Sequence, residues 1–207
     1  MPYYKDKQIL FIHIPKTGGT VIERAIKKNI SETLYSGRTN TLLEFPYNKT
    51  SLQHQFYKTI YKFRDKLNVN FDNIQIFSVV RNPYDRIISD LFWYKLIDKE
   101  FNSNQVYDVI KNNYLYRDDL DNHNKPQYCF LVDENDDLIK TIKLFHTEKI
   151  NELNYELNKF LGFNIDIKQK EVNKDYRKYL NNNSISLINN FYKKDFELFN
   201  YKLKTEL

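Results

Sequence analysis

The sequence predicts an α/β protein with a central parallel β-sheet flanked by helices. An apolar, β-branched run at residues 9–14 is followed by a glycine-containing loop and a helical pattern. A second apolar run at residues 74–80 is again followed directly by a helical pattern. Continuous apolar strands that alternate with helices are typical of parallel sheets with both faces covered. With 207 residues, the chain is expected to form a single domain over residues 1–207.

The first strand leads into a P-K-T-G-G-T loop at residues 15–20, which contains two of the four glycines in the chain. Because glycine has no Cβ atom, the backbone N–H groups of a glycine-containing loop can close around an anion. A helix that begins at Gly19 or Thr20 directs its positive dipole end to the same place, and Lys16 adds a full charge. We therefore expect a phosphate-binding loop. Its anion contacts are assigned to Lys16, Thr17, Gly18, Gly19 and Thr20.

This loop differs from a Walker A motif, which places a Lys-Ser/Thr pair after its last glycine. In the present chain the lysine precedes the glycines, and the sequence contains no Gly-Lys-Ser/Thr. The alternative interpretation of the stretch is an ordinary glycine turn between a strand and a helix.

The other segments are assigned from periodicity and from turn residues. Residues 21–29 are expected to be helical, residues 31–50 a loop, and residues 51–66 a helix with Ser51 as its N-cap. The later assignments are a turn and strand within 136–145, a helix at 149–161 closed by Gly162 and a polar, basic stretch at 168–179.

The second apolar strand runs directly into Arg81. Asn82 is a suitable N-cap and Pro83 suits the first helical position, so a helix is expected through Trp93. If the two strands are parallel, Arg81 and the loop at residues 15–20 meet at one carboxyl edge of the sheet. The sequence thus predicts two cationic groups that face one site.

Arg81 and Ser89 are the candidate phosphate ligands of this second motif. A guanidinium can grip a phosphate through two parallel N–H bonds, and Ser89 adds a hydroxyl two turns into the helix. The alternative role of Arg81 is a salt bridge with Asp85 or Asp90. Arg86 is expected to brace the helix through local carboxylates.

Together the two motifs resemble those of sulfotransferases that use 3′-phosphoadenosine 5′-phosphosulfate (PAPS). The loop at residues 15–20 resembles their 5′-phosphosulfate loop, and R-N-P-Y-D-R-I-I-S at residues 81–89 resembles their 3′-phosphate motif. The resemblance implies a P-loop-like sulfotransferase fold with PAPS as donor, 3′-phosphoadenosine 5′-phosphate (PAP) as product and no metal. It further implies that Arg81 and Ser89 bind the 3′-phosphate, while the loop and Lys16 hold the 5′-phosphosulfate. Residues 195–201 resemble the terminal helix of the family, and residues 168–179 fall where relatives can carry a loop that closes over the nucleotide, with a solvated linker as the alternative.

Two further stretches resemble the heparan and chondroitin sulfotransferase branch of this family. Gln53-His54-Gln55 falls where relatives carry an active-site histidine, so His54 is expected to be the catalytic base. A histidine base typically contributes about 10²–10⁴-fold. H-N-K-P-Q at residues 123–127 resembles an acceptor-side stretch, although Asn124 replaces the usual tryptophan. It makes His123 the reserve base, and it makes His123 and Gln127 candidates for acceptor binding.

The remaining titratable residues near the motifs are given other roles. His13 lies on a strand that is expected to be buried and is assigned a structural role. His146 is placed at a strand end, away from both motifs. Glu23 is expected to form a salt bridge on the helix surface, with a possible role as an alternative base.

The amino-acid composition of the chain limits the classes of function that it can have. The net charge of +5 suits an anionic partner, but basic and acidic residues are interleaved, so nucleic acid is not expected. The single cysteine excludes an internal disulfide framework and a cysteine-rich zinc site. No 18-residue apolar run and no signal peptide are visible, so a cytoplasmic or otherwise soluble protein without a membrane anchor is expected.

The sequence therefore predicts a PAPS-dependent sulfotransferase that acts on a hydroxyl group. A glycan is the favoured acceptor, and a tyrosine hydroxyl or a small alcohol stays open. Two other functions remain as alternatives. One is a nucleotide phosphotransferase with a degenerate P-loop, and the other is a non-catalytic nucleotide-binding module.

Overall fold

The computed structural model of the protein describes residues 1–35, 50–167 and 176–206. Within these ranges, a central sheet has the strand order β3-β1-β2-β4-β5. Its parallel part consists of β2, β4 and β5, which confirms the predicted α/β class, and antiparallel β1 and β3 extend it into a mixed sheet. The strands are β1 (Tyr3–Tyr4), β2 (Ile9–Ile12), β3 (Thr33–Leu34), β4 (Gln75–Val80) and β5 (Lys143–His146).

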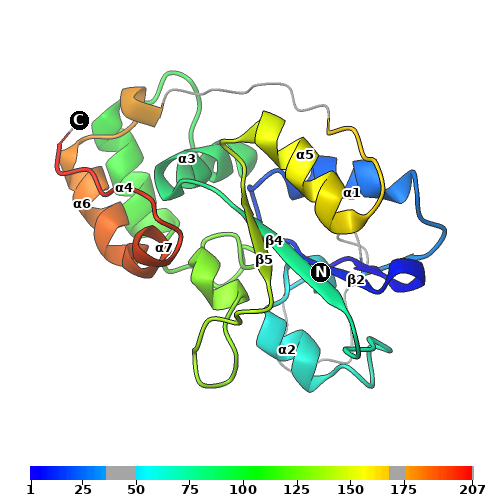
Figure 1. Cartoon of the computed structure of the whole chain (residues 1–207). Coiled ribbons are helices and arrows are strands. Elements are labelled where there is room, and N and C mark those ends of the chain that lie inside the picture. Colours follow the sequence, from blue (N-terminus) through cyan, green and yellow to red (C-terminus); the bar gives the residue numbers. More distant parts are fainter. Residues whose placement is uncertain (36–49, 168–175, 207) are drawn as a thin grey trace.

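Helices surround this sheet on both faces and at one end (Figure 1). The α-helices of the described ranges are α1 (Gly19–Lys27), α2 (Tyr57–Lys62), α3 (Pro83–Trp93), α4 (Ser103–Asn113), α5 (Ile150–Leu161), α6 (Asn182–Phe191) and α7 (Lys193–Leu198). Short 3₁₀ turns lie at Lys5–Lys7, Leu52–His54, Gln127–Phe130 and Tyr176–Lys178.

Side chains of the central strands alternate between two buried faces. Phe11 and Phe77 pack in the cluster that includes α1 and α5, whereas Leu10 and Ile76 pack in the cluster that includes α2. Figure 1 shows α1 and α5 together on one side of the sheet and α2 on the other. Because both faces are buried, β2 and most of β4 are apolar, which is why these two strands are visible in the sequence.

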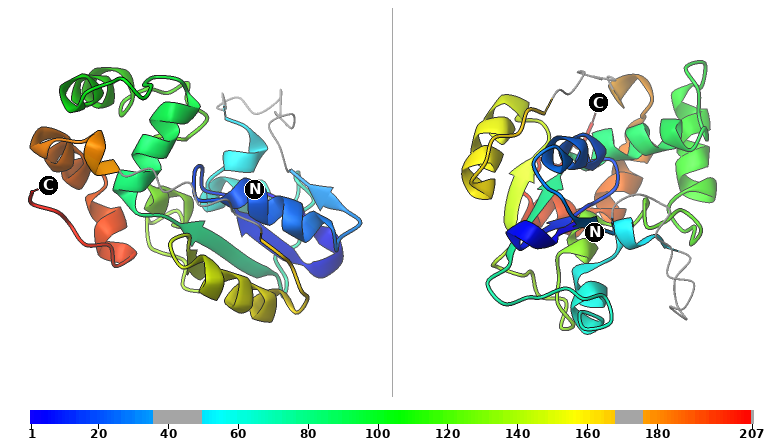
Figure 2. Two further views of the ribbon diagram at one scale, coloured as in Figure 1. Left: turned by 90° about the horizontal axis from the view of Figure 1, so that it is seen from above. Right: turned by 90° about the vertical axis from the view of Figure 1, so that its right-hand side faces the viewer.

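A third cluster forms at the end of the sheet, where α3 leaves β4. It joins α3, α4, α6 and α7 around buried side chains such as Tyr84, Ile88 and Ile188. Figure 2 shows this helical group beside the sheet, with the C-terminus within it. The group gives the carboxyl edge of the sheet a rigid wall, namely α3.

The local signals around the two motifs are confirmed. The side chain of Asn82 caps α3 by accepting a hydrogen bond from the amide of Tyr84 (3.0 Å), Pro83 occupies the first turn, and the helix ends at Trp93. Helix α1 begins at Gly19, as expected. Gly162 closes α5 with a positive φ of 74°.

The helix predicted at residues 51–66 is confirmed only over Tyr57–Lys62. A 3₁₀ turn ends at His54, Gln55 and Phe56 are extended with ψ near 150°, and only then does the short helix α2 begin. The side-chain amide of Gln55 donates to the carbonyl oxygens of Thr50 and Ser51, which stabilises the break. The hydroxyl of Ser51 binds Asp121 instead of capping a helix. The break matters because it turns His54 into the protein interior.

Several other segments differ from the predicted ones. Helices α4 and α6 lie in stretches for which the sequence analysis assigned no element, and the terminal helix α7 begins and ends slightly earlier than the predicted 195–201. The loop predicted at 31–50 contains β3, and its residues 36–49 lie outside the described ranges. The same holds for residues 168–175 of the polar loop predicted at 168–179.

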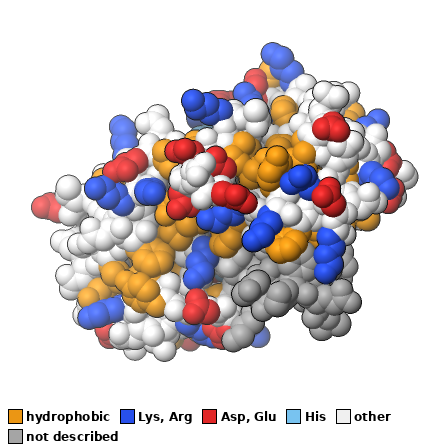
Figure 3. Space-filling model, turned by 90° about the horizontal axis from the view of Figure 1, so that it is seen from below, with side chains coloured by type: hydrophobic (Ala, Val, Ile, Leu, Met, Phe, Trp, Pro, Cys, Tyr) orange, Lys and Arg blue, Asp and Glu red, His pale blue; other side chains and the backbone are white. Residues whose placement is uncertain are grey.

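The helices and the surface charges can be compared with what membrane insertion and nucleic-acid binding require. Among the described residues, none of the helices has the length and apolar character needed to cross a bilayer. On the face shown in Figure 3, Lys and Arg side chains are interleaved with Asp and Glu. That face therefore lacks the continuous basic surface that nucleic-acid binding favours.

Candidate active site

A cavity of about 480 Å³ lies at the carboxyl ends of β2 and β4, within the roughly 300–1,000 Å³ typical of ligand pockets. Lys16 and Arg81 both line it, and Nη1 of Arg81 donates a hydrogen bond to the carbonyl oxygen of Lys16 (3.2 Å). The two sequence motifs therefore share one cavity. The predicted site residues that line it are Lys16, Gly18, Gly19, Thr20, His54, Arg81, Ser89 and His123.

The geometry of the first loop explains both of its glycines. Gly18 has a φ of 86°, which a residue with a Cβ adopts only at a cost. A Cβ atom on Gly19 would lie 2.3 Å from the imidazole ring of His13. Helix α1 begins here, and its first N–H groups have no intrahelical partner. With no acidic residue in its first turn, the helix terminus suits an anion.

The hydroxyl of Thr17 is used within the protein. Thr17 has a fully buried side chain, and its hydroxyl donates to the carbonyl oxygen of Ile14 (2.9 Å). Its own carbonyl oxygen accepts a hydrogen bond from the hydroxyl of Thr147 (2.7 Å). The Thr17 hydroxyl thus fixes the loop from behind and does not face the cavity, whereas Thr20 is exposed and lines it.

The side chain of Gln127 fixes the backbone of Arg81 by two hydrogen bonds. The side chain of Gln127 accepts a hydrogen bond from the amide of Arg81 (2.9 Å) and donates to its carbonyl oxygen (2.8 Å). Gln127 is itself held by the buried carboxylate of Asp195. Gln127 is fully buried and does not line the cavity, so its predicted contact with the acceptor is not supported by its position.

The electrostatic surroundings of Arg81 are mixed. Burial lowers the pKa of Arg81, and the charges of Asp85 and Glu148 act in the opposite direction. Asp90, one of the two suggested salt-bridge partners, instead accepts hydrogen bonds from His123 and Tyr114. Asp85 lines the same cavity as Arg81.

The expectation for Arg86 is wrong. Its guanidinium donates to the carbonyl oxygens of Pro15, His123 and Lys125 at 2.7–3.0 Å, instead of pairing with carboxylates on its own helix. Arg86 therefore links the loop at residues 15–20 to the segment that carries His123. Because it is buried and satisfied by backbone oxygens, it acts as a cross-link between the walls of the cavity.

Helix α3 contributes a third wall. Asp85, Ser89 and Trp93 follow one another at intervals of four residues, so they lie on one face of the helix, and all three line the cavity. Ser89 is half-buried and Trp93 is 56% exposed, so the face runs from the interior toward solvent. The ammonium group of Lys16 lies 4.4 Å from the centroid of the Trp93 ring.

Three histidines form a row along the inner wall of the cavity. The rings of His13 and His54 meet edge to face with centroids 5.1 Å apart, and those of His54 and His123 do so at 4.9 Å. Nδ1 of each ring contacts a carboxylate oxygen. A ring that donates its Nδ1 proton to that carboxylate keeps Nε2 as an acceptor in its neutral form.

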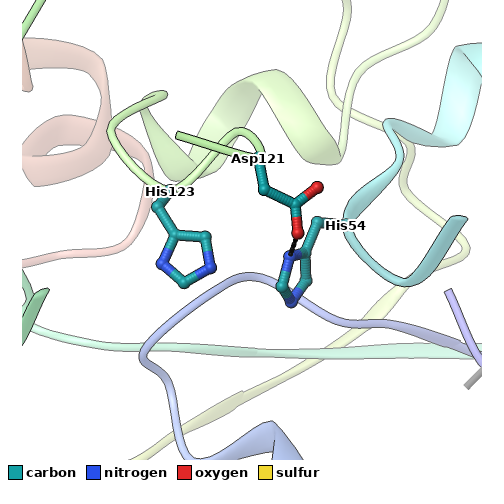
Figure 4. Close-up of side chains that lie close together, drawn as sticks. All are labelled: His54, Asp121 and His123. Atoms are coloured by element: carbon teal, nitrogen blue, oxygen red, sulfur yellow. Dashed lines mark hydrogen bonds and ion pairs between the residues drawn. The ribbon is translucent and has the colours of Figure 1, made fainter. Parts of the chain in front are cut away.

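His54 occupies the middle of this row and is paired with Asp121. Its Nδ1 lies 2.7 Å from Oδ2 of Asp121, which Figure 4 shows as the dashed contact. The amide and hydroxyl of Ser51 donate to the same carboxylate at 2.6 and 2.9 Å. Burial lowers the pKa of His54 to about 3, although the bond with Asp121 acts in the opposite direction. His54 is therefore a neutral imidazole in a fixed orientation.

Asp121 was missed by sequence reasoning. It lies 67 residues from His54 along the chain, and no local pattern links the two. Burial raises the pKa of Asp121, but its bonds with His54 and Ser51 lower it, and the net shift is downward. The ionised carboxylate thus orients the histidine, as acidic partners of catalytic histidines do.

His123 is held in the same manner by Asp90, at 2.7 Å from Oδ1 to Nδ1. Its Nε2 is buried and has no hydrogen-bond partner among the described residues. Figure 4 shows its ring beside that of His54, on the loop that also carries Asp121. The segment at 121–123 therefore supplies both the partner of His54 and the adjacent imidazole.

Glu23 does not form the predicted surface salt bridge. It is buried, accepts a hydrogen bond from His13 and a second one from the side chain of Gln53 (2.8 Å). Burial lowers the pKa of His13, and the bond with Glu23 opposes this shift. His13 is buried against Gly19, and it also lines the cavity. Its structural role stays a prediction. His146 contacts the hydroxyl of Tyr201 (3.0 Å) and does not line the cavity.

His54, Asp121 and His123 also have the donor atoms that transition metals use, within 4.8 Å of one another. Asp121, however, already accepts hydrogen bonds from His54 and from Ser51. The 2.7 Å contact is a hydrogen-bond distance. We therefore interpret the cluster as an oriented base.

Comparison with known proteins bears on the whole chain. Residues 3–202 match the family model described as "Sulfotransferase family". The match includes both strand-loop-helix units that build the cavity. No curated protein and no solved structure matches the sequence.

Proposed function

Because the chain belongs to the sulfotransferase family, we propose that it transfers the sulfuryl group of PAPS to a hydroxyl group of a carbohydrate. Sulfuryl transfer in general follows from family membership. The observation that carries the finer proposal is the convergence of Lys16, Arg81 and the Asp121-held His54 on one cavity. We further propose that residues 1–207 work as one sulfotransferase domain.

The donor is proposed to span the two motifs. The first turn of α1 and Lys16 would hold the 5′-phosphosulfate, since backbone N–H groups and an ammonium group favour anions. Arg81 and Ser89 would hold the 3′-phosphate, with Arg81 fixed by Gln127 from behind. A 3′-phosphate contact of this kind would distinguish PAPS from ATP, which lacks this group.

His54 is proposed as the general base. Its Nε2 would take the proton of the acceptor hydroxyl while the hydroxyl oxygen bonds to sulfur. The bond from sulfur to the bridging phosphate oxygen breaks, and its electron pair stays on the phosphate of PAP. Lys16 and the loop amides would stabilise that developing charge, which is preorganised electrostatic catalysis. Asp121 would stabilise the imidazolium that forms.

The other candidate residues are proposed to act around this centre. His123 packs edge-to-face against His54, with centroids 4.9 Å apart, and so fixes one side of the base. It is also the reserve base and a candidate contact for the acceptor. Gln127 would act indirectly, by holding Arg81 at the nucleotide end.

Thermal unfolding with nucleotides tests the donor proposal. We expect PAP at 100 times its Kd to stabilise the protein by about 2.7 kcal/mol, whereas ATP with magnesium gives no comparable shift. Arg81→Ala should remove most of the PAP effect. Stabilisation by ATP–magnesium alone would instead support the phosphotransferase alternative, which the absence of a Gly-Lys-Ser/Thr sequence disfavours.

A second measurement separates an enzyme from a binding module. We expect PAP release from PAPS in the presence of an acceptor, and its loss in His54→Ala with PAP affinity retained. A His54→Ala protein with full turnover would rule out the base assignment. Binding of PAP without transfer to any acceptor would support the non-catalytic alternative.

A further inference from the structure

We propose that Trp93 is the platform of the acceptor subsite and that it stacks on the ring of a sugar next to the point of transfer. This inference rests on the proposed function and specifies its acceptor. Trp93 ends α3, lines the cavity and is 56% exposed. An exposed indole on the wall of a cavity offers a large, rigid apolar surface to a ligand.

The position of Trp93 along α3 assigns it to the acceptor rather than to the nucleotide. Ser89, one turn earlier on the same face, belongs to the proposed 3′-phosphate site. Trp93 lies farther out on this face, and the Lys16 ammonium is 4.4 Å from its ring centroid. Lys16 is the residue proposed to contact the leaving oxygen, so a ring stacked on Trp93 would lie beside the transferring group.

The rest of the cavity favours a polyhydroxylated ring over a phenol. Beside apolar residues such as Val21 and Phe92, its lining contains the imidazoles of His54 and His123 and the amide of Gln53. A pyranose has an apolar C–H face for the indole and hydroxyl groups on its edge for these polar groups. A tyrosine side chain carries one hydroxyl on an otherwise apolar ring, so it would leave most of these groups without a partner.

Trp93 could instead serve to position Lys16, and kinetic measurements can distinguish this role from acceptor binding. The ring could merely position the Lys16 ammonium through a cation–π contact. Loss of that contact would lower kcat, because Lys16 acts on the leaving group. Loss of a platform for the acceptor would instead raise the KM of the acceptor, with kcat nearly unchanged.

The test uses Trp93→Leu and Trp93→Phe, with Tyr116→Leu as the matched control. Tyr116 is a 72% exposed aromatic outside the cavity lining. The probes are unsulfated chondroitin and heparosan oligosaccharides and a tyrosine-containing peptide. We expect Trp93→Leu to raise the KM for an oligosaccharide about tenfold or more, while Trp93→Phe keeps most of the affinity and the control is unchanged.

Fluorescence gives a readout that does not depend on turnover, because Trp93 is the only tryptophan in the chain. With PAP bound, we expect an oligosaccharide to shift the emission of Trp93 and the peptide to leave it unchanged. An unchanged KM in Trp93→Leu, a loss of kcat alone, absence of any response to the oligosaccharides, or transfer to the peptide alone would each overturn the inference. Failure of PAP to bind would instead refute the proposed function.

Discussion

Asp121→Asn is the most informative change at the proposed active site. In the wild type, the Asp121 carboxylate accepts hydrogen bonds from Nδ1 of His54 and from the amide and hydroxyl of Ser51. An asparagine has the same shape but only one acceptor oxygen. If that oxygen stays with Ser51, the side-chain NH₂ faces Nδ1 of His54. The imidazole must then carry its proton on Nε2, where the proposed base needs a lone pair.

The expected loss follows from this change of tautomer. Removal of general-base catalysis costs about 10²–10⁴-fold in kcat, which corresponds to about 2.7–5.4 kcal/mol in the barrier. PAP affinity should stay within about twofold, because Asp121 lies on the base side of the cavity and Arg81 is unaffected. The replacement is isosteric, so we expect stability to fall by only about 1–3 kcal/mol, the cost of a weakened buried hydrogen-bond group.

Two measurements check this prediction. Transfer from PAPS gives kcat, and ¹⁵N chemical shifts of the histidine ring nitrogens report the tautomer of His54 directly. Asp119→Asn is the matched control, because Asp119 lies two residues away and pairs with Arg117 at the surface. Wild-type kcat in Asp121→Asn, or an unchanged His54 tautomer together with a large loss of kcat, would refute the reasoning.

Three further predictions concern the nucleotide end and the buried histidines. Arg81→Lys should weaken PAP binding about 10–100-fold in calorimetry, because a lysine cannot form the bidentate contact with a phosphate. The affinity for adenosine 5′-phosphate, which lacks the 3′-phosphate, should stay unchanged. Equal losses for both ligands would contradict a 3′-phosphate role. Gly19→Ala should lower the free energy of unfolding in urea by about 1–3 kcal/mol and weaken PAP binding, because the added Cβ meets the ring of His13. Gly162→Ala is the control: Gly162 has a φ of 74° and open space around it, so PAP affinity should stay unchanged. Burial lowers the pKa of His54 from its ordinary 6.5 to about 3, so the unfolded chain takes up a proton first and stability should fall as pH drops below 6.5, by at most about 1.4 kcal/mol per pH unit from this residue. His54→Gln should flatten that slope in unfolding curves measured between pH 7.5 and 5, and an unchanged slope would show that the histidine is not held neutral.

Where the sequence analysis failed, the physical reasons differ from one segment to another. Leu52, Phe56 and Ile60 recur at helical spacing, but their core contacts are also satisfied by a 3₁₀ turn, an extended break and a short helix. Periodicity could not reveal that Gln55 stabilises the break. For α4 a signal was present, because Asn102 and Gln105 form a capping box at its start.

The partners of the histidines were beyond any local pattern. His54 meets Asp121 across 67 residues, and His123 meets Asp90 across 33. Asp90 lies on α3, and His54 lies in a 3₁₀ turn. The identity of each carboxylate therefore depends on how the loop at residues 121–123 packs against these two elements. Glu23 was misassigned for a related reason, since its burial depends on Gln53 from a distant turn.

The sequence by itself determined the two strand–loop–helix motifs and their order, because a glycine pair before a helix and an Asn-Pro helix start act within a few residues of the chain. It also determined the buried parallel strands, whose apolar character follows from coverage on both faces. Only the tertiary structure decided which carboxylate orients each histidine, and that Trp93 lies beside Lys16. Those contacts join segments that are remote in sequence, and only the closing of the hydrophobic cores brings them together.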